Sequence, residues 1–257
     1  ASAIKLSGAI PKFVDVDKSY NIDTNQIEKQ ITNKTKAIIP VHLTGRPANM
    51  SPIIELSEKY NISVIEDAAQ AIMAKYNNKP VGSIGDIGCF SFHPLKTLNA
   101  CGDAGAITTN NKLIYEKLLI LRNLGLENRN NCESWSINSR LDSIQASILN
   151  VKINFIKEWT YARRKNADIY NKSFSNMNEI ILPPENENNY SVYHTYIILQ
   201  STVPGHPPCS TRAGFTNFKY TRSTRWKATH FHPQATGIAA TPTLTPRHPT
   251  GSCPSPH

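Results

Sequence analysis

The chain has 257 residues, 39% hydrophobic and 18% charged, which suits one large globular domain and excludes wholesale disorder. The net charge of +9 does not by itself indicate a nucleic-acid partner, because residues 1–200 carry 22 basic against 19 acidic side chains and the excess lies mostly in residues 201–257. No stretch approaches the roughly 18 consecutive apolar residues of a transmembrane helix, and no secretory signal is visible. The five cysteines are scattered and form no Cys-x-x-Cys pair, which argues against a disulfide or zinc scaffold and favours a reducing cytoplasm.

Short apolar segments alternate with amphipathic or turn segments over the first half of the chain. Ser51 and Pro52 supply an N-cap and a first-turn proline for one expected helix. The alternation predicts an α/β domain with a mostly parallel central sheet flanked by helices, and with its chemistry at the carboxyl ends of the strands. Strands are expected over residues 36–43, 62–67, 86–92 and 105–109, and helices over residues 52–60 and 113–121.

The longest periodic segment spans residues 140–173. Its apolar side chains recur at spacings of three and four, which predicts one long amphipathic helix that links two domains or forms a dimer seam. One more strand is expected over residues 193–199. The apolar positions of the expected helix are Leu141, Ile144, Ile148, Val151, Phe155 and Trp159. The expected divisions are a partial large domain over 1–139, a linking helix and the start of a small domain over 140–200, and an irregular tail over 201–257.

The composition changes abruptly after Gln200. Residues 201–257 contain eleven Thr, nine Pro and no Asp or Glu, and they show no apolar periodicity. They could form a disordered tail, a nucleic-acid-binding arm of interleaved aromatic and basic side chains, or the product of a reading-frame shift near codon 200. We favour the frameshift, because the acidic residues and the periodicity are lost together at one point.

Two polar groups stand at the ends of successive expected strands. Asp67 ends one strand and is followed by Gln70, while Ser91 lies near the end of the next and is followed by Lys96. Taken singly, such a carboxylate is an ordinary helix N-cap and such a lysine is solvated. Together they match what pyridoxal 5'-phosphate requires, namely a lysine amine for a Schiff base, an acid beside the ring nitrogen and a hydroxyl for the phosphate.

These residues lie in longer motifs that resemble the DegT/StrS family, fold-type-I pyridoxal phosphate-dependent aminotransferases of nucleotide-linked keto sugars. The resemblance covers residues 1–199 and implies a fold-type-I α/β domain with an incomplete C-terminal small domain. The matching segments, in chain order, are Phe13–Asp17, Tyr20–Asp23, Val41–Gly45, Ile65–Ala71, Gly82–Asp86, Phe90–Leu98, Gly102–Ala106, Leu121–Gly125 and Ile137–Asp142.

The resemblance implies a role for five residues. Lys96 would bind the cofactor covalently and move protons, and Asp67 would pair with the pyridinium nitrogen. Gln70 would lie beside the ring near its phenolic oxygen, and Ser91 would bind the phosphate. Asn138 would reach the phosphate of the neighbouring subunit's cofactor, which makes a homodimer part of the active site. No metal ion is expected.

The resemblance further implies a nucleotide-sugar substrate, glutamate as the amino donor, and a place in amino-sugar and polysaccharide biosynthesis, with no nucleic-acid or membrane partner. A sugar dehydratase is an alternative that Lys96 argues against, because that branch carries His there. A non-catalytic regulatory or sensing protein on the same fold is another. For His42, His93 and His194 we expect structural or hydrogen-bonding roles.

Relatives carry further segments on both sides of the matched region. Upstream stand a Gly-Thr turn that supports the phosphate and an aromatic that stacks on the ring, and downstream stands a substrate loop. We therefore expect this chain to be N-terminally truncated, to lack the substrate side of its pocket and to have little activity.

Overall fold

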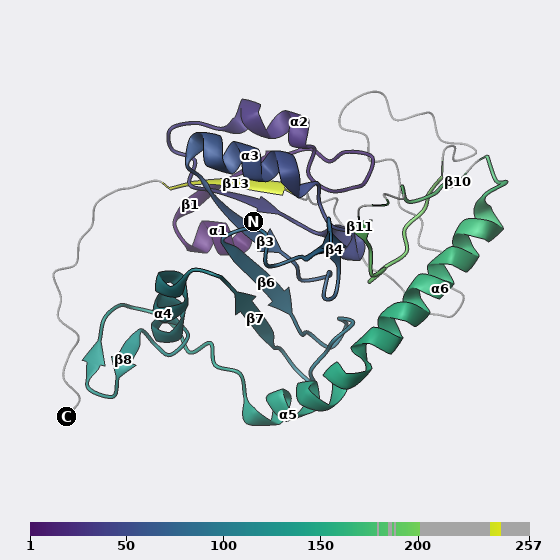
Figure 1. Ribbon diagram of the computed structural model, residues 1–257. Coiled ribbons are helices and arrows are strands. Elements are labelled where there is room, and N and C mark those ends of the chain that lie inside the picture. Colours follow the sequence, from purple (N-terminus) through teal and green to yellow (C-terminus); the bar gives the residue numbers. More distant parts are fainter. Residues whose placement is uncertain (179, 185–186, 188, 201–236, 243–257) are drawn as a thin grey trace.

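A six-stranded mixed sheet forms the centre of the protein (Figure 1). The structure is a computed structural model, and it describes residues 1–178, 180–184, 187, 189–200 and 237–242. The strands, in spatial order, are β1 (Ala9–Val14), β13 (Gly237–Pro242), β2 (Ala37–Pro40), β3 (Ser63–Asp67), β6 (Ile87–Ser91) and β7 (Gly105–Thr108). β2, β3 and β6 are mutually parallel, and β1 shares their direction because it lies antiparallel to β13, which is itself antiparallel to β2. β7 runs against β6. The expected α/β sheet of mostly parallel strands is confirmed.

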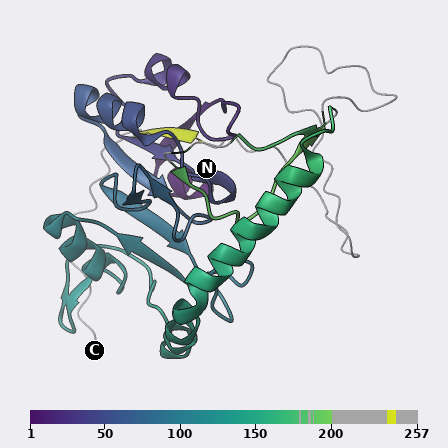
Figure 2. The same ribbon diagram turned by 45° about the vertical axis from the view of Figure 1, so that its right-hand side comes forward.

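Helices cover the two faces of this sheet. α2 (Thr24–Ile27) and α3 (Met50–Tyr60) lie together on one face, as Figures 1 and 2 both show, and Ile27 and Ile53 pack there against Ile38 and Val64. The short helix α1 (Ser2–Leu6) lies on the other face, where Ile4 packs near Ile39. Ile38 and Ile39 face opposite ways because successive side chains of a strand alternate between the two faces.

The helix expected over residues 52–60 begins at Met50, and its N-cap is Asn49 rather than Ser51. The Tyr76 hydroxyl donates to Asn49 Oδ1 at 2.7 Å and lies 2.8 Å from Ser51 Oγ, so both side chains are engaged across the fold. Pro52 then lies in the first turn, where a missing N–H is tolerated.

The helix expected over residues 113–121 is confirmed with nearly the same bounds. α4 (Lys112–Leu121) is capped by the Asn111 side chain, which accepts from the N–H groups of Leu113 and Ile114. Gly125, with φ of +74°, lies just beyond its end.

The prediction of a single long helix over residues 140–173 is wrong. Helix α5 (Ser143–Lys152), a 3-10 turn η3 (Ile153–Phe155) and helix α6 (Ile156–Phe174) replace it. The turn brings Leu149 and Ile156, on either side of the break, into one buried cluster. Figure 2 shows α6 running beyond this break as one long helix beside the sheet. Meanwhile Ile144 (68% exposed) and Val151 (63% exposed) face outward, so the apolar stripe that suggested the helix is not the buried face.

The strand expected over residues 193–199 is also mostly wrong, because only its last residue belongs to one. That strand is β12 (Leu199–Gln200), which pairs with β10 (Ile180–Ile181). Upstream, the Arg163 side chain binds the carbonyl oxygens of Tyr193 and His194 at 3.3 and 3.2 Å. Those carbonyl oxygens accept hydrogen bonds from a side chain rather than from a neighbouring strand.

Of the segment expected to be irregular, residues 237–242 instead form β13 between β1 and β2, and the rest of residues 201–257 lies outside the described part. No helix in the described residues is long and apolar enough to cross a bilayer. The remaining elements are η1 (Glu28–Gln30), η2 (Leu43–Gly45), a small sheet of β4 (Lys75–Tyr76), β5 (Lys79–Pro80) and β11 (Asn189–Tyr190), and the hairpin of β8 (Leu126–Asn128) and β9 (Asn131–Cys132).

Candidate active site

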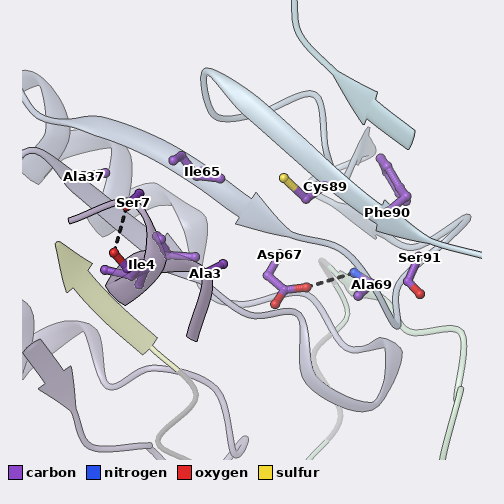
Figure 3. Close-up of a pocket in the computed structure, with 11 residues that line it drawn as sticks. Ala3, Ile4, Ser7, Ala37, Ile65, Asp67, Ala69, Cys89, Phe90 and Ser91 are labelled. Carbon is purple, nitrogen blue, oxygen red and sulfur yellow. Dashed lines mark hydrogen bonds between the residues drawn. The ribbon is translucent and has the colours of Figure 1, made fainter. Parts of the chain in front are cut away.

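Asp67 is the last residue of β3 and is fixed by its backbone on both sides. Its carbonyl oxygen accepts from the His42 N–H at 3.0 Å, and the next N–H, of Ala68, donates to the Cys89 carbonyl at 2.9 Å. One carboxylate oxygen, Oδ1, accepts from the Ala69 N–H at 3.1 Å (Figure 3). No hydrogen bond to Oδ2 is found among the described residues, so this oxygen is available to a cation.

Asp67 opens onto a cavity of about 450 Å³ between the sheet and α1. In Figure 3 the Asp67 side chain lies between α1 and the turn that carries Ala69, with Cys89 and Ser91 on the neighbouring strand. Burial and then the Asp67 charge raise the pKa of the Cys89 thiol, so this group contributes a neutral wall. The remaining wall residues, mostly apolar, are Ala3, Ile4, Ser7, Ala37, Ile39, Ile65 and Phe90.

Ser91 lies at the carboxyl end of β6, next to β3 in the sheet. Its Oγ accepts from the His93 N–H at 3.3 Å, which leaves the hydroxyl hydrogen available for donation to a ligand. Asp67 and Ser91 therefore present an acceptor and a donor to the same cavity.

Lys96 lies in the turn that follows β6, where its N–H donates to the His93 carbonyl at 2.8 Å. Burial lowers the pKa of the half-buried Lys96 amine from 10.5, and the nearby Asp67 carboxylate partly opposes this shift. A lowered pKa leaves more of the amine unprotonated near neutral pH, the form that attacks a carbonyl carbon. The end of β3 and the turn after β6 thus bring Asp67 and Lys96 near enough for the carboxylate charge to act on the amine.

Gln70 follows Asp67 and is oriented by the backbone of Thr44. The Thr44 N–H donates to Gln70 Oε1 at 2.7 Å, so the Nε2 hydrogens of the amide point away from this contact and can donate elsewhere. Thr44 holds an uncommon backbone conformation, with φ of +62°. The Gln70 amide is therefore fixed in one orientation.

Asn138 does not line the cavity beside Asp67. It lies in an exposed segment, forms an antiparallel bridge with Asn123, and its Oδ1 accepts from Arg140 Nε at 3.0 Å. Arg140 Nη1 also donates to Asn123 Oδ1 at 3.2 Å. Of the five residues that the sequence grouped, Asp67 and Ser91 line this cavity, and the Asp67 charge acts on the Lys96 amine. Gln70, Lys96 and Asn138 are not among the residues that line it.

The sequence did not predict that His194 would lie next to Lys96 in the fold. His194 lies beside Lys96, with Nδ1 3.5 Å from Thr97 Oγ1. Burial and then the charges of Lys96 and Arg163 lower the pKa of His194 to about 4, so the ring is neutral near neutral pH. His194 lies 97 positions beyond Thr97, and no local pattern links it to Lys96.

His42 and His93 are the other two histidines for which the sequence predicted structural or hydrogen-bonding roles. His42 is fully buried against Glu66, which agrees with the expected structural role, whereas His93 is exposed and its Nδ1 accepts from the Leu95 N–H at 3.2 Å. No group of three or more His, Cys, Asp or Glu side chains able to hold a metal ion is found within the described residues.

Residues 1–207 match the model of the DegT/DnrJ/EryC1/StrS aminotransferase family. The chain belongs to this family. It is 43% identical over 201 residues to a "Pleiotropic regulatory protein" of Geobacillus stearothermophilus, covering 77% of this chain and 54% of that protein. It is also 43% identical to the dTDP-3-amino-3,6-dideoxy-alpha-D-galactopyranose transaminase of Aneurinibacillus thermoaerophilus, covering 76% and 54%.

Among solved structures of similar fold is NtdA from Bacillus subtilis with bound cofactor PMP, at 32% identity and a TM-score of 0.71, covering 77% of this chain and 46% of NtdA. Membership of the DegT family and the fold-type-I α/β architecture are thereby confirmed. The chain spans about half the length of the curated relatives it matches.

Proposed function

We propose that this DegT-family protein is a pyridoxal phosphate-dependent aminotransferase that transfers an amino group from glutamate to a nucleotide-linked keto sugar. One arrangement carries the proposal: Asp67 ends strand β3, and the half-buried Lys96 lies in the turn after the adjacent strand β6, near enough for the Asp67 charge to act on the Lys96 amine. The names of relatives support the substrate class, since the Aneurinibacillus protein is a dTDP-sugar transaminase. Dependence on pyridoxal phosphate is a property of the family, and NtdA is known with PMP.

The side chains at the strand ends fit such a cofactor. The free oxygen of Asp67 suits a protonated ring nitrogen, and the apolar walls beside it, Ile65 and Ala69 among them, suit a planar ring. The Ser91 hydroxyl hydrogen suits a phosphate oxygen, and the outward Nε2 of Gln70 suits a phenolic oxygen. Donors and acceptors therefore agree in kind with the groups that each would meet.

Pyridoxal phosphate, when bound, supplies an electron sink next to the carbon that gains or loses the amino group. Lys96 would hold the cofactor through Nζ and would carry a proton to and from that carbon, for which its lowered pKa is favourable. Asp67 would keep the ring nitrogen protonated through an opposite charge. The neutral His194 beside them adds no further positive charge to the site near neutral pH.

The proposal includes a cytoplasmic homodimer in which Asn138 serves the neighbouring subunit's phosphate. Around Asn138 the chain exposes large apolar side chains, including Trp135 and Ile137 at 73% each and Ile144 at 68%. Monomeric surfaces rarely group such residues, so the patch supports contact with a second subunit. Arg140 holds Asn138 Oδ1, which turns the Nδ2 donors outward as phosphate binding requires.

The test combines cofactor trapping with amine transfer. The purified chain is loaded with pyridoxal phosphate, reduced with borohydride and mapped by mass spectrometry, and we expect the pyridoxyl group on Lys96. A label on Lys75 or Lys79 would contradict the assignment. Amine transfer from glutamate to UDP- or dTDP-linked keto sugars tests the reaction itself. Specific labelling of Lys96 with no transfer to any keto sugar, even by a chain in which the family pattern continues past residue 207, would instead favour a regulatory protein.

A further inference from the structure

The turn that carries Lys96 is packed against helix α5, far along the chain. Leu98 and Ala100, two and four residues beyond Lys96, are buried in one cluster with Leu149 of α5 and Ile156 of α6. Fixing the apolar residues on one side of a turn does not by itself fix the peptide of Lys96, because backbone rotations remain possible between them. A second, polar set of contacts supplies that constraint.

A chain of hydrogen bonds connects α5 to the backbone of Lys96. Lys152 Nζ, at the last residue of α5, donates to Asn99 Oδ1 at 2.6 Å and to the Asn99 carbonyl oxygen at 3.0 Å. Asn99 Nδ2 then donates to the Lys96 carbonyl oxygen at 2.8 Å. Both ends of the Asn99 amide are therefore occupied, with the ammonium on its oxygen and the carbonyl on its nitrogen.

The chemistry of the partners fixes the orientation of this amide. An ammonium group only donates and a carbonyl oxygen only accepts, so a flipped Asn99 side chain would lose both bonds. The bond from Lys152 is charge-assisted, a class that is shorter and stronger than bonds between neutral groups. One amide is thus held rigidly between a helix end and the Lys96 peptide.

A second contact from α5 fixes the far end of the same turn. Gln145 Oε1 accepts from the Cys101 N–H at 2.8 Å. The turn from Lys96 to Cys101 is therefore attached to one helix at two points, Asn99 and Cys101. Since α5 begins shortly after Asn138, the same helix adjoins the exposed segment that the dimer proposal uses.

We propose that Lys152 and Asn99 are positioning residues. They hold the backbone carbonyl oxygen of Lys96 and thereby set the location of its side-chain amine. The inference rests on the proposed function, because it assigns these residues to a reactive lysine. Neither side chain lines the cavity beside Asp67. They act through Lys96, and small displacements of a reacting group from its working geometry lower rates strongly.

The experiment measures the environment of Lys96 directly and needs no cofactor. Each lysine of the folded chain is acetylated with trace acetic anhydride across a pH series, and mass spectrometry gives an apparent pKa for Lys96. The variants are Asn99→Ala, Lys152→Met, Lys152→Arg and the Asn99→Ala/Lys152→Met double variant. Lys157→Met, which removes an exposed lysine of α6, is the matched control.

Loss of the link should let the turn loosen and expose the Lys96 amine, so its pKa should rise toward 10.5 in Asn99→Ala, by about half a unit. Lys152→Met should cause a similar rise, and the double variant no more than either single one. Lys152→Arg, which keeps donors at this position, and Lys157→Met should stay near the parent.

Asn99→Ala decides the matter because it removes no charge. An unchanged Lys96 pKa in folded Asn99→Ala would overturn the proposal. So would a Lys152→Met effect that persists in full in the Asn99→Ala background, since that would reflect lost charge alone. If Asn99→Ala fails to fold, equal values for Lys152→Met and Lys152→Arg would overturn it. Failure of cofactor labelling at Lys96 would contradict the proposed function. It would not change the result of the acetylation experiment, which needs no cofactor, so the two failures can be told apart.

Discussion

The His42 imidazole and the Glu66 carboxylate are in contact at 3.0 Å between Nε2 and Oε2, and both side chains are completely buried. His42 Nδ1 accepts from the Ala48 N–H at 3.0 Å, so Nε2 carries the hydrogen that is directed at Glu66. Glu66 additionally accepts from three N–H groups, those of Gly82, Ile84 and Gly85, at 2.7 to 2.8 Å. One carboxylate thus joins the β3 strand end to the loop before β6.

Replacing this carboxylate with an amide should be strongly destabilising. Burial raises the pKa of Glu66, but hydrogen bonds from His42, Gly85 and Gly82 outweigh it and lower the pKa from 4.5. In Glu66→Gln the amide NH2 must face at least one N–H donor, so we expect a loss of about 2–4 kcal/mol in the free energy of unfolding. Urea denaturation monitored by circular dichroism measures it.

The control for Glu66→Gln is Glu58→Gln, an exposed site on α3 where a change within about 0.5 kcal/mol is expected. The stabilising effect of Glu66 should be present above pH 4.5 and disappear as the pH falls through its lowered pKa. Equal stability of Glu66→Gln and the parent at pH 7 would contradict a structural role for this carboxylate.

Asp67→Asn should separate cofactor binding from its chemistry. Asparagine keeps the size of the side chain and an acceptor for the Ala69 N–H, so the fold and the labelling of Lys96 should persist. It removes the charge that would stabilise a protonated ring nitrogen, so turnover in an active dimer should fall by about a hundredfold or more. Amine transfer under saturating donor measures this, and near-parent turnover would restore the interpretation of Asp67 as an N-cap.

Stability should also depend on His194 below neutral pH. The unfolded chain takes up a proton on this side chain near pH 6.5, whereas in the folded chain the pKa is lowered to about 4. Acidification from pH 6.5 toward 4 therefore favours the unfolded state, while above pH 6.5 the group contributes nothing.

His194→Gln should flatten that dependence by about 1 kcal/mol between pH 7 and 5, a value reduced for partial exposure of the ring. Urea unfolding at the two pH values measures it, with the exposed His93→Gln as the comparison. Identical pH profiles for His194→Gln and the parent would mean that the ring titrates normally in the folded chain.

The sequence predicted the parts of this molecule that depend on local pattern. β3 and β6 follow from their apolar runs, and Asp67 and Lys96 were selected as candidates because strand ends gather at one edge of a sheet. The break at residues 153–155 was missed because apolar spacing of three and four continues through it. The strand over 193–199 was wrong because Arg163, about thirty residues away, binds that backbone.

The contacts that fix the site are long-range, and this limits any prediction from sequence. Lys152 and Asn99 are separated by 53 positions, and an isolated Lys or Asn carries no signal of its partner. Thr44 orients Gln70 through a backbone N–H, which is identical in every residue except proline. Such pairings depend on packing, so only the folded structure reveals them.

A shared active site predicts complementation between two inactive subunits. Lys96→Ala removes the reactive amine, and Asn138→Ala removes the side chain expected to serve the neighbouring subunit. In a mixed dimer both defects can fall in one pocket and leave the other intact, so activity should recover to at most about a quarter of the parent level for random mixing. Amine transfer after verified subunit exchange measures this, and recovery no greater than either parent variant would contradict a shared site.

The last prediction concerns residues 201–257. The family match ends at residue 207, close to the point where the acidic residues and the apolar periodicity are lost. A globular segment of that length ordinarily has about a quarter of its residues charged, with both signs, whereas this one has six basic residues and none acidic. Nine prolines interrupt helices and central strands, although the six residues of β13 do join the sheet.

If a reading-frame shift near codon 200 produced this segment, one of the other two frames of the coding DNA should continue the family pattern. Translating both frames beyond that codon should reveal an apolar-periodic segment with acidic residues and a Pro-x-Pro loop, and the family match should extend past residue 207. Early stop codons in both frames would contradict the frameshift and leave residues 201–257 as a natural sequence. In the corrected chain we expect amine transfer well above that of the present one, because the substrate side of the pocket would then be built.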